Sequence, residues 1–122
     1  MICRGWAAEW QWSVSIPGIV SEETGGHPRA FLYIPDDCRR VKAVMVGNHN
    51  MCEETLFENE AFRRAIRGMG LALVWVTPGW DQVWNADKGT PEAYWQMLKD
   101  FAEISGYGEL SYVPVVPIGH SA

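Results

Sequence analysis

The sequence predicts an α/β fold: a mostly parallel sheet with an antiparallel pair of strands at its N-terminal edge and crossover helices between the parallel strands. Two observations carry this prediction. Two short strand-like segments come first, and nearly continuous apolar segments then alternate with segments of helical periodicity. With 122 residues, the chain has the length of one domain.

The first two segments are predicted to form the antiparallel edge pair. Residues 9–16, E-W-Q-W-S-V-S-I, alternate polar and apolar side chains, which is typical of a half-buried strand. Pro17-Gly18 ends this strand, and a polar, glycine-rich turn leads to a second strand at residues 29–34, R-A-F-L-Y-I. Because the connection is short, we expect these strands to pair with each other.

Three later segments are predicted to be parallel strands. Residues 41–47 and 71–77 are almost entirely apolar, as expected for strands that are covered on both faces. A third apolar segment at residues 113–118 contains Pro114 and Pro117, and each proline removes a donor from the ladder. We therefore expect a strand here with uncertain limits.

Two helices are expected between these strands. The first spans residues 53–68 and is stopped by glycines, and its buried side is predicted to consist of Leu56, Phe62, Ala65, Ile66 and Met69. The second has Thr90 as its N-cap and ends near Ser105. Its buried side is predicted to consist of Tyr94, Met97, Leu98, Phe101 and Ile104.

The composition excludes several classes of function. Fifteen acidic and ten basic residues give a net charge of -5, which disfavours binding to nucleic acid. No apolar run approaches the roughly 18 residues that span a bilayer, so no membrane partner is expected. The first residues lack the apolar core of a signal peptide. The protein is therefore expected to be cytoplasmic, unless a signal peptide lies upstream and directs it to the periplasm or outside the cell.

Cysteine and tryptophan usage gives weaker signals. Cys3, Cys38 and Cys52 show no C-x-x-C spacing, so neither a metal site nor a disulfide framework is expected, and no cofactor is predicted. Seven tryptophans are many for this length, and most are expected to supply core area. Trp80 and Trp84, in a predicted loop, are candidates for lining a substrate cleft instead.

The strongest chemical signal follows the last predicted strand. Gly119, His120, Ser121 and Ala122 match the first four positions of G-x-S-x-G, the sharp strand-to-helix turn that exposes a nucleophilic serine. Ser121 is therefore the candidate nucleophile. The alternative is a serine that caps a following helix. His120 is excluded as the base, because its side chain points away from a serine adjacent in sequence.

The segment after residues 41–47 is a candidate oxyanion hole. It reads N-H-N-M, and a loop at this position can donate a backbone N–H to a developing oxyanion, together with the N–H of the residue after the nucleophile. The candidate donors are Asn50 or Met51, with Ala122. His49 is a candidate substrate contact or an ordinary loop histidine. After the strand at 71–77, Asp81 has the same two interpretations, substrate contact or turn residue.

These motifs together resemble the alpha/beta hydrolases of the poly(3-hydroxybutyrate) depolymerase and feruloyl-esterase-like kind. The resemblance lies in R-A-F-L-Y-I-P, in the strand ending G-N-H-N, in the strand ending W-V-T-P-G, and in P-I-G-H-S-A. It implies that residues 1–122 form the N-terminal half of an α/β-hydrolase fold, a single incomplete domain. The acid and the histidine of the triad would then follow Ala122. The loop after the first parallel strand departs from the H-G-G-G of lipases, which leaves the donating amide open.

The resemblance implies a serine hydrolase, with a carboxylic-ester hydrolase as the leading hypothesis. Ser121 would form an acyl-enzyme with a small-molecule or polymeric ester, of a carbohydrate or a polyester. A serine peptidase or thioesterase of the same fold is an alternative, because the elbow serves any acyl transfer. A non-catalytic binding module on the same scaffold is another. Without a base, Ser121 is a weak nucleophile, so the 122 residues alone are expected to be inactive and poorly folded.

Overall fold

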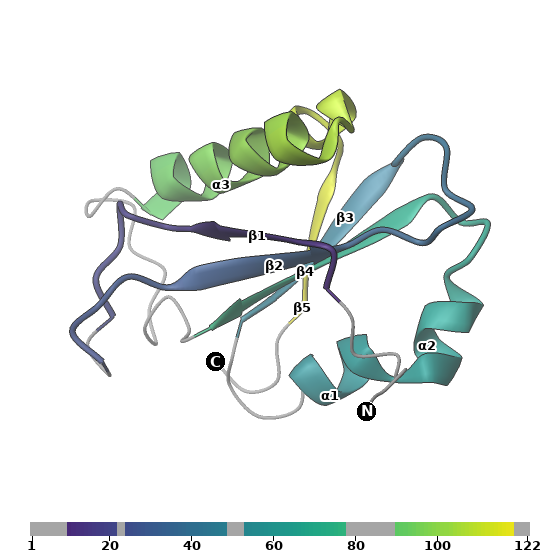
Figure 1. Ribbon diagram of the computed structural model, residues 1–122, viewed down its shortest axis with the longest axis horizontal. Coiled ribbons are helices and arrows are strands. Elements are labelled where there is room, and N and C mark those ends of the chain that lie inside the picture. The colour runs from purple at the N-terminus through teal and green to yellow at the C-terminus, as the bar shows by residue number, and fades with distance from the viewer. Residues whose placement is uncertain (1–9, 22–23, 49–52, 78–89, 119–122) are drawn as a thin grey trace.

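The computed structural model describes residues 10–21, 24–48, 53–77 and 90–118 (Figure 1). Over these ranges the chain forms one sheet with helices on both of its faces, which confirms the α/β class. The strands are β1 Trp12–Ser15, β2 Arg29–Tyr33, β3 Ala43–Asn48, β4 Leu71–Thr77 and β5 Val115–Ile118. The helices are α1 Glu53–Glu58, α2 Glu60–Ala65, α3 Thr90–Ser105 and the short 3-10 helix η2 Gly108–Ser111.

The strands lie in the order β1-β2-β4-β3-β5. β1 pairs antiparallel with β2, as predicted, and β2 pairs antiparallel with β4. β3 is central and pairs in parallel with both β4 and β5. Two of these four pairings are therefore antiparallel, and the described sheet is mixed rather than mostly parallel.

Side chains of β4 alternate between the two faces of the sheet. Ala72, Val74 and Val76 face the core beneath α3, whereas Leu73 and Trp75 face the core beneath α1 and α2. All five are buried, because helices cover both faces. This two-sided burial explains why the strand is almost wholly apolar.

Helix α3 packs over one face of the sheet (Figure 1). Met97, Leu98 and Phe101 are buried as predicted. Ile104 was predicted to be buried too, but its side chain is 53% exposed. It lies toward the open side of β1, where no strand of the described chain continues the sheet. Thr90 was predicted to be the N-cap, the residue that precedes the helix. It is instead the first residue of α3.

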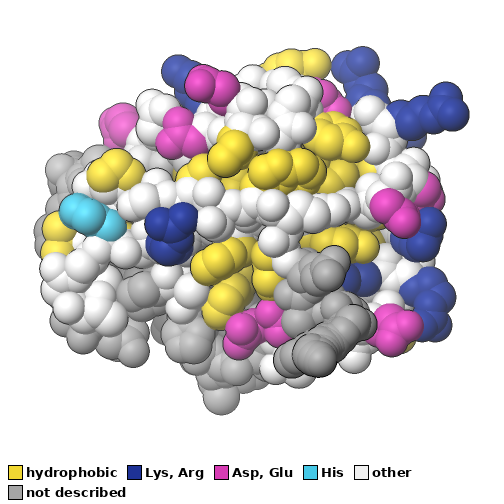
Figure 2. Space-filling model, in the orientation of Figure 1, with side chains coloured by type: hydrophobic (Ala, Val, Ile, Leu, Met, Phe, Trp, Pro, Cys, Tyr) yellow, Lys and Arg dark blue, Asp and Glu magenta, His cyan; other side chains and the backbone are white. Residues whose placement is uncertain are grey.

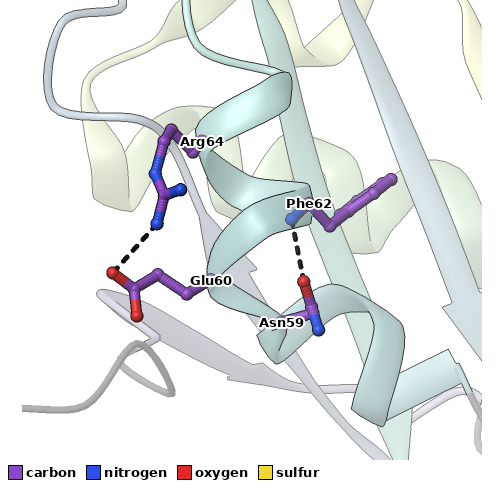
Figure 3. A network of polar contacts seen from close by, with 4 residues as sticks. All are labelled: Asn59, Glu60, Phe62 and Arg64. Carbon is purple, nitrogen blue, oxygen red and sulfur yellow. Dashed lines mark hydrogen bonds and ion pairs between the residues drawn. The ribbon is translucent and has the colours of Figure 1, made fainter.

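The single helix predicted over residues 53–68 is wrong, because the chain breaks it at Asn59. The backbone of Asn59 is extended, and its side-chain Oδ1 accepts the N–H of Phe62 at 2.9 Å (Figure 3). An asparagine side chain that bonds to the backbone ahead of it favours a helix start over a helix interior. Two short helices, α1 and α2, replace the one expected, and a Glu60–Arg64 ion pair lies on the outside of α2.

The break also changes which side chains of this segment are buried. Phe57 and Ile66 are buried against the sheet, the second as predicted. Leu56, Ala65 and Met69 were predicted to be buried, but all three are exposed, Leu56 by 39% and Met69 by 56%. The reason is that α1 and α2 point in different directions, so one continuous apolar stripe does not face the sheet. Arg63 takes a buried position instead.

Pro117 fits into β5 because its backbone nitrogen points away from the neighbouring strand β3. It begins at Val115, so Pro114 lies before it. The N–H of Val44 donates to the carbonyl of Pro114 at 3.0 Å. Alternate residues therefore turn toward β3, and the nitrogen of Pro117 faces away from it. Because none of the described strands pairs with that side of β5, the missing donor costs no ladder bond.

Candidate active-site edge

The three parallel strands end at the same edge of the sheet, here called the carboxyl edge. β3 ends at Asn48, β4 at Thr77 and β5 at Ile118. Gly47 of β3 is the register partner of Ile118 in the neighbouring strand β5. Ligands of open α/β sheets bind beyond the carboxyl ends of the strands. A ligand of this scaffold is therefore expected at this edge.

All candidate site residues from the sequence follow these strand ends, and all lie outside the described residues. They are His49, Asn50 and Met51 after β3, Trp80, Asp81 and Trp84 after β4, and Ser121 and Ala122 after β5. The structure establishes the positions of the three strand ends that these segments follow. The segments that carry the candidate nucleophile and the candidate oxyanion donors follow neighbouring strands.

The turn before β2 reaches the same edge, because β2 runs antiparallel and Arg29 lies beside Thr77. His27 lies in this turn, and its Nδ1 is 2.7 Å from the carbonyl oxygen of Ile19. From β2 to β5 there are three strand spacings, or about 14 Å. The turn that holds His27 therefore adjoins a strand three places away from β5.

The amino-terminal end of β3 is held by a long-range contact. The N–H of Val41 donates to Oε2 of Glu109 at 2.7 Å, and Glu109 lies on η2. Both residues thus fix the start of the central strand against the segment that leads into β5. The sequence offered no signal for this contact, because the two residues are 68 positions apart.

A buried arginine holds α1 and α2 against the sheet. The Nε–H of Arg63 donates to the carbonyl of Phe57 at 2.6 Å. Its guanidinium lies 3.9 Å from the ring centroid of Tyr33 and 4.9 Å from that of Trp10. The indole N–H of Trp10 in turn donates to Oε2 of Glu58 at 2.8 Å. We call these five residues the arginine clamp. The clamp thus fixes α1, the helix that begins directly after residues 49–52 in the sequence.

The sequence contained a partial signal for the clamp. Arg63 lies three positions before the buried Ile66, so helical spacing places both on one side of α2. A single arginine at such a position is usually solvated, but the rings of Tyr33 and Trp10 and the carbonyl of Phe57 favour its burial here. Trp10 also stacks on Trp75, at 6.2 Å between centroids, so these tryptophans do supply core area. Trp95, by contrast, is 51% exposed.

Two described groups have shifted pKa values, and they lie at opposite edges. Burial raises the pKa of the Tyr94 phenol, which keeps it a protonated donor well above neutral pH. Tyr94 belongs to the first turns of α3, which enters at the carboxyl edge after β4. Burial, followed by the charge of Asp37, raises the pKa of the Cys38 thiol. Cys38 lies between β2 and β3, at the amino edge, and is therefore remote from the candidate site.

Over the described ranges, no helix has the length and apolar character needed to cross a membrane. The same ranges contain no group of three or more His, Cys, Asp or Glu side chains that could hold a metal ion. In comparisons with known proteins, no family model, no curated protein and no solved structure matches the chain.

Proposed function

We propose that this chain belongs to a serine hydrolase of the alpha/beta-hydrolase type, a carboxylic-ester hydrolase in which Ser121 forms the acyl-enzyme. One observation carries the proposal. The G-H-S-A segment follows directly after β5, and β5 pairs in parallel with the central strand β3. A nucleophile elbow requires this order of strand and turn.

The register supports the pairing of nucleophile and oxyanion hole. Ser121 comes three residues after Ile118, and Asn50 comes three residues after Gly47. Ile118 and Gly47 are neighbours in the sheet, so the two segments start from adjacent points. Attack by the Ser121 oxygen places negative charge on the former carbonyl oxygen. The N–H groups of Asn50 or Met51 and of Ala122 are the proposed donors, each contributing roughly 10²–10³ in rate.

The proposed mechanism needs a base that removes the serine proton and an acid that orients this base. In the family that the motifs resemble, both residues follow the nucleophile in chain order. His27 lies about three strand spacings from β5, which supports looking for the base elsewhere. Trp80, Trp84, His49 and Asp81 are the proposed substrate contacts. Their chemistry suits an ester with a ring-shaped or polymeric portion, such as a carbohydrate or polyester ester.

Labelling with a fluorophosphonate probe tests the proposal on the full-length natural protein. The probe reacts with activated serines, so we expect one labelled site at Ser121 and complete loss of labelling in Ser121→Ala. Ser111→Ala is the matched control, because Ser111 lies on η2 at the opposite, amino edge of the sheet. Labelling that persists in Ser121→Ala, or that is lost in Ser111→Ala, contradicts the proposed nucleophile.

Turnover of paired substrates then tests the reaction class. p-Nitrophenyl acetate and a feruloyl sugar ester represent esters, and a peptide p-nitroanilide represents amides. We expect kcat/KM to be higher for the esters, with all activity lost in Ser121→Ala. A preference for the anilide would favour a peptidase on the same scaffold. A labelled protein that turns over none of them would contradict the ester-hydrolase proposal.

A further inference from the structure

Among the described residues, β1 is an edge strand whose outer backbone groups pair with no other strand. The N–H of Ile16 donates to the carbonyl of Pro28, next to β2, at 2.9 Å. Going back along β1 from Ile16, the backbone groups of successive residues point alternately away from β2 and toward it. Val14 therefore turns its backbone groups toward β2, whereas Ser13 and Ser15 turn theirs outward. No strand of the described part of the chain pairs with this side of β1. An edge of this kind is a template for another strand.

Helix α3 runs beside this edge (Figure 1). Side chains of the helix and of the strand together line a groove between them. The groove has a volume of about 520 Å³. Its strand side is lined by Ser13, Val14 and Ser15, and its helix side by Asp100, Glu103 and Ile104. Figure 2 shows hydrophobic side chains gathered along the line between α3 and β1. A strand edge next to a helix is the arrangement in which a peptide can add to a sheet.

The charges differ between the two faces of this groove. Asp100 and Glu103 lie on the α3 face, to which the side chain of Val14 also points. Arg29 is the register partner of Ser15, so its side chain lies on the opposite face. Its Nη2 donates to Oγ of Ser13 at 2.8 Å, which holds the guanidinium at the edge. A docked strand would thus meet carboxylates on one face and a cation on the other.

We propose that this groove binds an extended peptide of another protein, which adds to the outer edge of β1 as a further strand. Its side chains on the α3 face are basic and face Asp100 and Glu103. Its side chains on the other face are acidic and face Arg29. Main-chain bonds to Ser13 and Ser15 supply sequence-independent affinity, and the alternation of charge supplies specificity.

The same charges argue against a second copy of this chain at the edge. Two copies that pair antiparallel through β1 are related by a two-fold axis perpendicular to the sheet. Both α3 helices then lie on one face, and Glu103 and Asp100 of one copy approach those of the other. The two Arg29 side chains approach each other on the opposite face. Like charges that face each other across strands are destabilising, and each copy carries a net charge of -5.

Fluorescence anisotropy with a labelled nine-residue peptide tests the proposal. In the probe, lysine and glutamate alternate, so each kind of charge occupies one face of an extended strand. The control peptide has the same composition, with its lysines and glutamates in separate blocks. We expect the alternating peptide to bind at least about tenfold more tightly than the blocked one, with affinity that falls as salt rises.

Two variants assign the binding to the groove. Glu103→Lys reverses a charge in the groove, and Glu92→Lys makes the same change at an exposed site of α3 that does not line it. We expect about tenfold weaker binding for the first and no change for the second. Ser15→Pro removes an outward N–H without breaking a β1–β2 bond, and should also weaken binding.

Three results would overturn the proposal. The first is equal binding of the alternating and blocked peptides. The second is peptide binding that Glu103→Lys leaves unchanged. This result is decisive even if the Ser15→Pro variant does not fold. The third is a dimer in sedimentation velocity that Ser15→Pro converts to a monomer, because the edge would then be occupied by a second copy.

Discussion

Replacing Arg63 tests whether the shape of the guanidinium, rather than its charge, stabilises the fold. The side chain is 5% exposed and donates to the carbonyl of Phe57. A hydrogen bond to a charged group contributes about 1.5–3 kcal/mol. The rings of Tyr33 and Trp10 each add about 0.5–2 kcal/mol to a desolvated cation. These gains oppose the cost of burying the cation, which is several kcal/mol.

The balance predicts an order among three variants. Arg63→Met keeps the packing of the stem and removes the buried charge, so we expect a loss of about 1–2 kcal/mol. Arg63→Ala also leaves a cavity and should cost about 3 kcal/mol. Arg63→Lys keeps the charge but loses the planar group and the Nε–H, so it should cost about 3–5 kcal/mol. Methionine is therefore expected to be the mildest substitution.

Urea unfolding measures these losses, and tryptophan emission is a suitable signal because Trp10 and Trp75 lie at the clamp. Arg64→Met is the matched control. Arg64 is the next residue, its side chain is 67% exposed, and its ion pair with Glu60 contributes no more than about 0.5 kcal/mol. If lysine proves milder than methionine at position 63, the charge stabilises the site and the reasoning from planar stacking is wrong.

Three further predictions concern the core, the backbone and the cysteine. Phe101→Ala should cost about 3–5 kcal/mol in urea unfolding, whereas Ile104→Ala on the same helix should cost less than about 0.5 kcal/mol; equal losses would contradict the burial pattern. Gly70→Ala should cost more than Gly68→Ala: both have positive φ, but only at Gly70 would a Cβ come within 2.9 Å of another side chain. Because folding raises the Cys38 pKa, alkylation by iodoacetamide should reach half its maximal rate at a higher pH in the native than in the urea-unfolded protein, measured with the other cysteines replaced by serine.

The strands could be predicted because their signals are local. Residues 71–77 were predicted as a strand and form β4 with the same limits. A strand covered on both faces must be apolar at every position, and this can be read from seven consecutive residues. The pairing of β1 with β2 followed from alternation and a short connection in the same way.

The predictions failed at one local feature and at two features that distant residues decide. Asn59 carried a local signal for a helix start, but the apolar periodicity around it outweighed that signal. The burial of Arg63 depends on the ring of Tyr33, which is 30 positions away in the sequence. The exposure of Ile104 depends on which strand ends the sheet beneath α3. Neither the burial of Arg63 nor the exposure of Ile104 can be read from a window of one helix, because each depends on the packing of other elements.

The path of the chain across the sheet explains why the edge of β3 and β5 is suited to a shared site. From β3 the chain passes over one face to β4, and from β4 it returns across β3 to β5. Because both crossovers are expected to be right-handed and run in opposite directions, their helices must lie on opposite faces. The separate cores beneath α1 with α2 and beneath α3 agree with this requirement. The segments that leave β3 and β5 therefore start side by side at Gly47 and Ile118. The proposed nucleophile and its proposed oxyanion donors require this adjacency.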